Sequence, residues 1–304
     1  ATTRPGASAS LMNMAERLMA KTAISSRVRT LPGDGAGEGE AIRANTTPAQ
    51  EAGRAYCPAA GPRARLRLDM IEFPSGFTWG ASSSAYQTEG AAREDGRGPS
   101  IWDAFSHTPG RTAGGATGDV ACDHYHRYRE DVALLARLGV SAYRFSISWS
   151  RVLPAGTGAI NRRGLDFYER LVDELLAAGL EPWACLYHWD LPLALQERGG
   201  WRSRDTAYRF VELARVVADA LGDRVRHLML MNEAGVAALL GHLLGVHAPG
   251  EADPLGYAAV AHHLNLATGL GRAALRQQSG ASIGTIVNCE PVVAGAPGEE
   301  HERA

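Results

Sequence analysis

The stretch EPWACLYHWD, residues 181–190, is the part of the sequence that says most about the fold. It begins as a mostly apolar run typical of a buried strand and ends in polar and aromatic side chains, with His188 and Trp189 together. A second apolar run farther along the chain ends in the same manner, in Asn232 and Glu233. Such endings predict strands whose carboxyl ends meet at one functional edge of a sheet.

Strand patterns and helix patterns alternate outward from this stretch. A strand, a helix and the next strand in this repeated order imply right-handed βαβ units and a parallel sheet. The predicted strands are residues 77–81, 140–147, 181–188, 226–231 and 282–288, and the predicted helices are residues 125–138, 165–175, 210–221 and 255–276.

Two architectures fit this alternation, an open doubly wound sheet and a (β/α) barrel. An open sheet usually carries a glycine-rich phosphate loop after a strand, and neither G-x-G-x-x-G nor a Walker sequence follows any predicted strand. Gln87 and Arg144 add further polar side chains near strand ends. Because barrels assemble their active sites from the carboxyl ends of several strands, the sequence favours a barrel.

The chain divides near residue 70. Glycine, alanine, arginine, serine and proline dominate residues 1–69, whereas all six tryptophans follow Met70. We therefore predict that residues 1–69 form a disordered, low-complexity leader and that residues 70–304 form the barrel domain.

Composition limits the partners. The formal net charge of −2 lacks the basic excess that binding to phosphates needs, and no apolar run approaches the length of a membrane span. The four cysteines lie far apart, His124 and His126 are not in a zinc-protease pattern, and the first residues do not resemble a secretory signal. The sequence predicts a cytoplasmic protein with no cofactor, metal, nucleic acid or membrane partner.

Four sequence blocks carry a specific resemblance. The blocks are FTWGASSSAYQTEGAAREDGRGPSIWDAF (77–105), YRFSISWSRVLP (143–154), EPWACLYHWDLPLAL (181–195) and MNEAGVAALLGHLLGVHAPG (231–250). In their order and spacing they resemble the N-terminal signature blocks of glycoside hydrolase family 1, over about residues 71–294. The resemblance implies a (β/α)8 TIM barrel that is incomplete here, with about five βα units present, and retaining hydrolysis of terminal β-linked sugars of the β-glucosidase type.

The resemblance implies roles for two adjacent residues of the last block. Retaining hydrolysis needs two carboxyl groups about 5 Å apart, and Glu233 matches the acid/base that protonates the leaving oxygen. Asn232 matches the residue that binds the sugar hydroxyl next to the reacting carbon. The alternatives are a solvated Glu233 and an Asn232 that serves only neighbouring backbone.

Four more residues receive roles from the resemblance. Gln87 and His188 match residues that bind hydroxyls on the far side of the sugar, and Trp189 matches a wall of the pocket. Arg144 matches the residue that holds the nucleophilic carboxylate ionised. For His188 and Trp189, the alternative is ordinary packing.

The sequence also departs from the family pattern. Ala234 follows Glu233 where the family has proline, small residues replace the aromatic residues that come next, and no Glu-Asn-Gly block supplies a nucleophile. We therefore expect the isolated chain to be inactive and to self-associate through open sheet edges. Two other hypotheses are a noncatalytic sugar- or protein-binding relative and an unrelated open α/β sheet.

Overall fold

A computed structural model of the chain describes residues 73–289. Its five strands form one sheet in the order in which they occur in the sequence, and all neighbours are parallel. The order of an open doubly wound sheet reverses at a switch point, whereas this order runs one way, as in a barrel. The predicted incomplete (β/α)8 fold is thereby confirmed. The strands are β1 (Gly80–Ser82), β2 (Ala142–Ser146), β3 (Glu181–Tyr187), β4 (His227–Asn232) and β5 (Ser282–Ile286).

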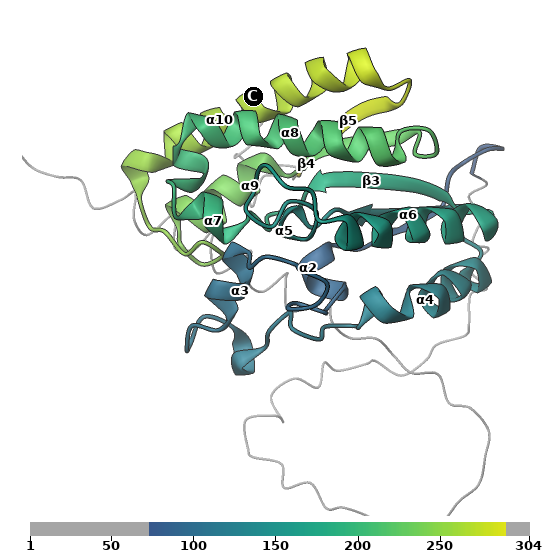
Figure 1. Cartoon of the computed structure of the whole chain (residues 1–304), viewed down its shortest axis with the longest axis horizontal. Coiled ribbons are helices and arrows are strands. Elements are labelled where there is room, and N and C mark those ends of the chain that lie inside the picture. Colours follow the sequence, from purple (N-terminus) through teal and green to yellow (C-terminus); the bar gives the residue numbers. More distant parts are fainter. Residues whose placement is uncertain (1–72, 290–304) are drawn as a thin grey trace, which may run out of the picture. The chain divides into compact units, whose positions relative to one another are not determined.

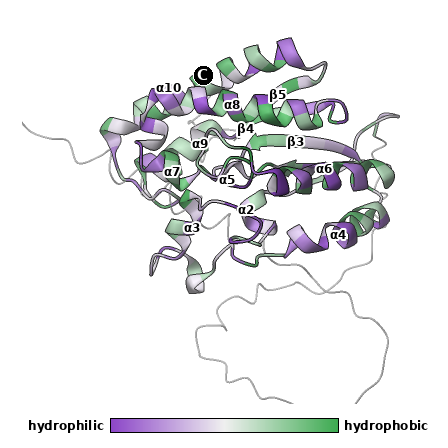
Figure 2. Cartoon of the chain, in the orientation of Figure 1, coloured by the Kyte–Doolittle hydropathy of each residue, from purple (hydrophilic) through white to green (hydrophobic). Residues whose placement is uncertain are grey.

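Four long helices join successive strands and lie beside one another in chain order (Figure 1). Each turns its apolar stripe inward and its polar residues outward, as the colours of α6 show (Figure 2). Gly139 ends the first of them with a φ of 74°, a conformation that glycine adopts without strain. The helices are α4 (His124–Leu138), α6 (Arg162–Ala177), α8 (Arg204–Leu221) and α10 (Pro254–Gln278).

Short helices occupy the loops after the strands, where a barrel carries its active site. Ser100 caps α3 through a reciprocal capping box with Asp103. The short helices are α2 (Ala85–Thr88), α3 (Ile101–Ser106), η3 (Ala113–Gly115), α5 (Trp149–Val152), α7 (Leu193–Gln196), η4 (Gly200–Arg202), α9 (Ala234–Ala238) and η5 (Leu239–Leu243), the last being a π-helix.

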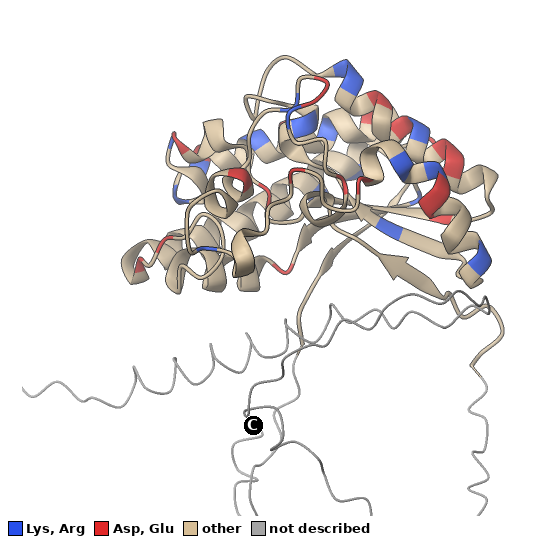
Figure 3. Cartoon of the chain, turned by 90° about the horizontal axis from the view of Figure 1, so that it is seen from below, with Lys and Arg blue, Asp and Glu red and all other residues tan. Residues whose placement is uncertain are grey.

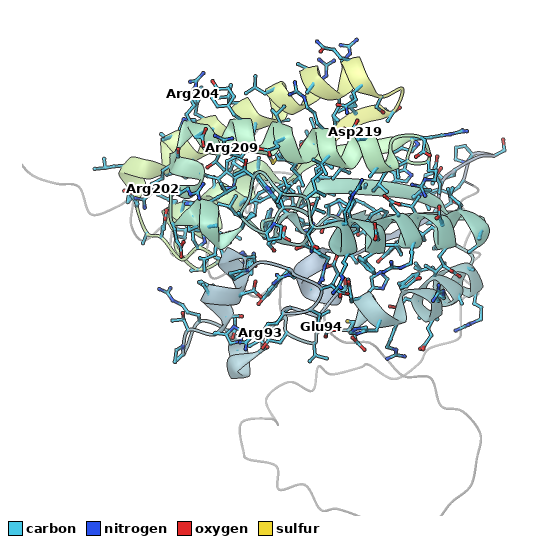
Figure 4. The ribbon with its side chains drawn as sticks, viewed as in Figure 1. Arg93, Glu94, Arg202, Arg204, Arg209 and Asp219 are labelled. Atoms are coloured by element: carbon cyan, nitrogen blue, oxygen red, sulfur yellow. The ribbon has the colours of Figure 1, made fainter. Side chains whose placement is uncertain are left out.

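Charged residues are frequent along the helices and loops and sparse along the strands (Figure 3). Arg204 and Arg209 lie near the start of α8 and Asp219 lies nearer its end (Figure 4). None of the helices that the structure describes is long and apolar enough to cross a membrane. The predicted leader, residues 1–69, lies outside the described residues and stays a prediction.

Candidate active site

Side chains from the middle of β2 and the carboxyl end of β4 meet. Asn232, the last residue of β4, is only 3% exposed. Its Oδ1 accepts a hydrogen bond of 3.2 Å from Nη1 of Arg144 on β2. Within residues 73–289, Arg144 forms no ion pair, and its buried Nε has no hydrogen-bond partner. This bond orients the side-chain amide of Asn232 and leaves its Nδ2 as a free donor among the described residues. The guanidinium of Arg144 likewise has N–H groups without a partner there.

His188 follows β3 directly and is a neutral imidazole. Burial, reinforced by the positive charge of Arg144, lowers its pKa from 6.5 to about 4. Its buried Nδ1 has no hydrogen-bond partner among the described residues. A neutral imidazole has one donor and one acceptor nitrogen, which suits a hydroxyl group better than an anion.

Trp189 and Glu233 share an uncommon backbone conformation. Trp189 follows β3 with a φ of 74°, and Glu233 follows β4 with a φ of 48°. Such values are rare for residues that carry a side chain, and they concentrate at functional sites. The two residues are linked, because Nε1 of Trp189 donates a 2.7 Å hydrogen bond to the carbonyl oxygen of Asn232. Glu233 itself is half-buried, so its carboxyl group can reach solvent.

The sixth predicted site residue, Gln87, lies in the segment after β1. It belongs to α2 and is exposed, and its Oε1 accepts a 2.7 Å hydrogen bond from Oγ of Ser84. The helix is anchored to the end of β2, since the backbone N–H of Ala85 donates to Oγ of Ser146 at 2.7 Å. Among the described residues, no hydrogen bond joins Gln87 to Arg144, His188, Trp189, Asn232 or Glu233.

A buried ionic cluster lies beside the site and was not singled out by the sequence. Arg151, which is fully buried, donates from Nε to Oε2 of Glu89 at 2.9 Å. Tyr168 donates its hydroxyl to the other oxygen of Glu89 at 2.6 Å. Burial, the largest single effect, would lower the pKa of Arg151, but the neighbouring Glu89, Tyr168 and Tyr125 together outweigh burial and raise that pKa. The sequence did contain a hint of this cluster, because Arg151 lies within the mostly apolar run Trp149–Leu153.

Asp190 is a second buried acid that sequence reasoning passed over. It follows Trp189, is 1% exposed, and neither of its carboxyl oxygens has a hydrogen-bond partner within the described part of the chain. Burial, and then the nearby charge of Glu89, raises its pKa from 3.8 to about 8, against the opposing charge of Arg97. Asp190 is therefore mostly protonated at neutral pH.

A small pocket lies beside Trp189, lined in part by Tyr187, Trp201, His242 and His247. Two polar pairs there are hydrogen-bonded: Nε1 of Trp201 donates to the Tyr187 hydroxyl at 2.8 Å, and Nδ1 of His242 lies 2.8 Å from a carboxylate oxygen of Glu251. Nδ1 of His247 is buried without a hydrogen-bond partner among the described residues. Within residues 73–289, no group of three or more His, Cys, Asp or Glu side chains is arranged to hold a metal ion.

Comparison with known proteins gives one consistent family. Residues 70–304 match the sequence model of Glycosyl hydrolase family 1. Thermostable beta-glucosidase B of Thermobispora bispora is 55% identical over 228 residues, which cover 75% of this chain and 47% of that protein. Beta-glucosidase A of Acetivibrio thermocellus is 51% identical over 222 residues, which cover 73% of this chain and 50% of that protein.

Solved structures agree with the sequence relatives. The Thermotoga maritima beta-glucosidase in complex with noeuromycin has a TM-score of 0.70 and 49% identity, covering 71% of this chain and 50% of that one. The same enzyme in complex with castanospermine has a TM-score of 0.74 and 46% identity, covering 75% and 52%. The chain thus spans about half the length of the curated relatives it matches.

Proposed function

This chain belongs to glycosyl hydrolase family 1, and we propose that it supplies the acid/base half of a retaining β-glycosidase of the β-glucosidase type. The observation that carries the proposal is the strand-end group of Asn232 and Glu233, held by Arg144 from β2 and by Trp189 after β3. The relatives support a carbohydrate substrate, because two solved ones are complexes with noeuromycin and castanospermine.

Each residue has a part in the proposed reaction. Glu233 protonates the leaving oxygen, and its half-buried position lets it face both protein and substrate. Asn232 donates from Nδ2 to the hydroxyl beside the reacting carbon, since its Oδ1 is occupied by Arg144. Neutral His188 and exposed Gln87 bind more distant hydroxyls, and the ring of Trp189 packs against the sugar.

The nucleophile comes from outside the described residues. A retaining enzyme needs a second carboxylate about 5–5.5 Å from the first. Arg144 has no acidic partner within residues 73–289, which supports its proposed task of receiving that carboxylate. We therefore expect the 304-residue chain alone to lack retaining glycosidase activity.

The test measures hydrolysis of a nitrophenyl β-glucoside by the chain alone and by the chain coexpressed with the C-terminal half of a family relative. The chain alone should be inactive, and coexpression should recover activity that Glu233→Gln abolishes. Glu130→Gln is the matched control, because Glu130 is an exposed residue of α4. Turnover by the chain alone that depends on Glu233 would disprove the missing-nucleophile proposal.

We also propose that the chain self-associates through its sheet edges. Within the described residues β1 and β5 each have a neighbouring strand on one side only, and β5 contains no buried residue. Phe73, Phe77 and Trp79 pack together just before β1 while staying about half exposed. Free edges and exposed apolar groups favour association. Sedimentation velocity should show oligomers, and a monodisperse monomer that unfolds cooperatively would contradict this proposal.

A further inference from the structure

We propose that Trp189 is a positioning residue that fixes the orientation of Glu233 through the peptide bond preceding it. The inference rests on the proposed function, because Glu233 is the acid/base only in that reaction. The contact that carries it is the 2.7 Å hydrogen bond from the indole N–H to the carbonyl oxygen of Asn232.

The peptide between Asn232 and Glu233 is held at both of its polar ends. Its carbonyl oxygen accepts the indole hydrogen bond from Trp189, after β3. Its N–H, which belongs to Glu233, donates a 2.9 Å hydrogen bond to the carbonyl oxygen of Ile286 on β5. Two hydrogen bonds from opposite sides fix the plane of this peptide, and Asn232 is too buried for water to replace them easily.

Glu233 needs such a restraint. Its backbone has φ 48° and ψ 58°, in the left-handed region that residues with a Cβ rarely occupy. Sparsely populated conformations persist only when the surrounding structure determines them. If the peptide rotated toward a more common conformation, the bond from Cα to Cβ would swing and carry the carboxyl group with it.

Trp189 is itself immobilised, so it can act as a fixed donor. Its ring centroid lies 5.6 Å from that of His188 and 5.7 Å from that of His247. The ring of His247 packs in turn against Trp102 of α3, at 5.5 Å. The indole is therefore held by His188 of its own turn and by His247 of another loop, which Trp102 supports from behind.

The effect on the proposed reaction is one of placement. A general acid must lie within hydrogen-bond reach of the atom that it protonates, and a misplacement of about 1 Å can cost on the order of 100-fold in rate. Trp189 acts through the backbone of Glu233, which differs from the role of a sugar-contacting wall.

The experiment compares amide hydrogen exchange in the 304-residue chain with that in Trp189→Phe, which keeps a ring but lacks the donor. The Glu233 amide should exchange about three- to tenfold faster in the variant, the effect of losing one hydrogen bond. Leu228 lies inside β4 and is fully buried, so its amide should keep its rate in the variant.

Trp183→Phe is the matched control. The indole of Trp183 donates to the side chain of Glu181 at 3.2 Å rather than to the backbone, so its loss should leave the Glu233 amide unchanged. Unchanged exchange of Glu233 in Trp189→Phe would overturn the proposal. Equal acceleration at Glu233 and Leu228 would also overturn it, because the effect would then be general destabilisation.

One measurement needs no variant. The indole N–H of Trp189 should exchange slowly in the unmodified chain, and rapid exchange would refute the hydrogen bond on which the proposal depends. Glu233→Gln separates the two proposals, because it removes the acid and keeps the peptide. If the complemented enzyme proves insensitive to Glu233→Gln, the proposed function fails while the exchange results still decide the positioning role.

Discussion

The middle of the sheet and its edges are built differently. Phe145, Ala184 and Leu228, on β2, β3 and β4, are no more than 2% exposed. β1 and β5, at the edges, contain no fully buried residue, and Val287 just after β5 is 67% exposed. Central strands have a neighbour on each side and helices over their outer face, whereas edge strands leave backbone groups available to another chain. Stability should therefore be concentrated in the middle.

The largest expected difference in stability is between two variants that each lose an aromatic ring, one in the buried middle of the domain and one beside an edge strand. Phe210 of α8 is fully buried, and its ring packs against Trp149 at a centroid distance of 5.9 Å. Phe210→Ala should lower the free energy of unfolding by about 3–5 kcal/mol. Phe77→Ala, before the edge strand, should lower it by less than about 1 kcal/mol, because Phe77 is 46% exposed.

Urea denaturation at a concentration where the chain remains monomeric measures both values. Similar losses of unfolding free energy in the two variants would contradict the prediction, since they would show that Phe73, Phe77 and Trp79 are packed as tightly as the middle of the sheet.

A second prediction concerns the buried acid at the end of β3. The pKa of Asp190 is about 8 in the folded chain and about 3.9 when unfolded. Between these values the folded state binds more protons, so the free energy of unfolding should fall as pH rises from about 4 to about 8. The slope should approach about 1.4 kcal/mol per pH unit at its steepest, and Asp190→Asn should flatten it.

The free energy of unfolding should be measured at about pH 5, 6, 7 and 8, which covers most of the range over which Asp190 titrates. Asp223→Asn is the control, because Asp223 is 72% exposed and should leave the slope unaltered. A slope that persists in Asp190→Asn would show that another group causes it and would contradict the prediction.

The smallest effect should come from two glycines. A methyl group at Gly235 of α9 would meet no atom within 4 Å, so Gly235→Ala should stabilise the chain by about 0.5–1 kcal/mol through helix propensity. At Gly164 of α6 the added carbon would overlap the backbone oxygen of Arg151, so Gly164→Ala should destabilise by about 1–3 kcal/mol. Thermal unfolding distinguishes the signs, and destabilisation by Gly235→Ala would show that the space beside Glu233 is filled.

The hydrophobic periodicity located the helices and strands correctly, but it did not give the bounds of every one of them. The helix predicted over 125–138 is α4, and the strand predicted over 181–188 is β3, in each case within one residue. The first strand was predicted over 77–81 but spans Gly80–Ser82: the rings of Phe77 and Trp79 pack with Phe73, and only the carbonyl oxygen of Trp79 bonds to β2, accepting from the N–H of Ala142 at 3.1 Å. Tertiary packing decides strand ends, and composition does not carry that information.

At the site, too, the sequence pattern identified some functional side chains and not others. His188, Trp189, Asn232 and Glu233 were marked by their places at the ends of apolar runs, and Arg144 by its place within one. Glu89 and Tyr168 were not, since Tyr168 fits the apolar stripe of α6 and only its contact with Glu89, 79 positions away, reveals a polar task. A side chain with an apolar ring and a polar tip can serve either purpose, and the sequence pattern cannot distinguish them.

The alternation of strands and helices, the family and the residues near the strand ends could be read from the sequence alone, because these depend on local pattern and motif order. The three-dimensional structure was needed to show that the strands lie in chain order, that Trp189 bonds to the peptide before Glu233, and that Asp190 is buried without a hydrogen-bond partner within residues 73–289. These facts depend on groups far apart in the chain, whose distances and shared burial arise only when the strands are brought together.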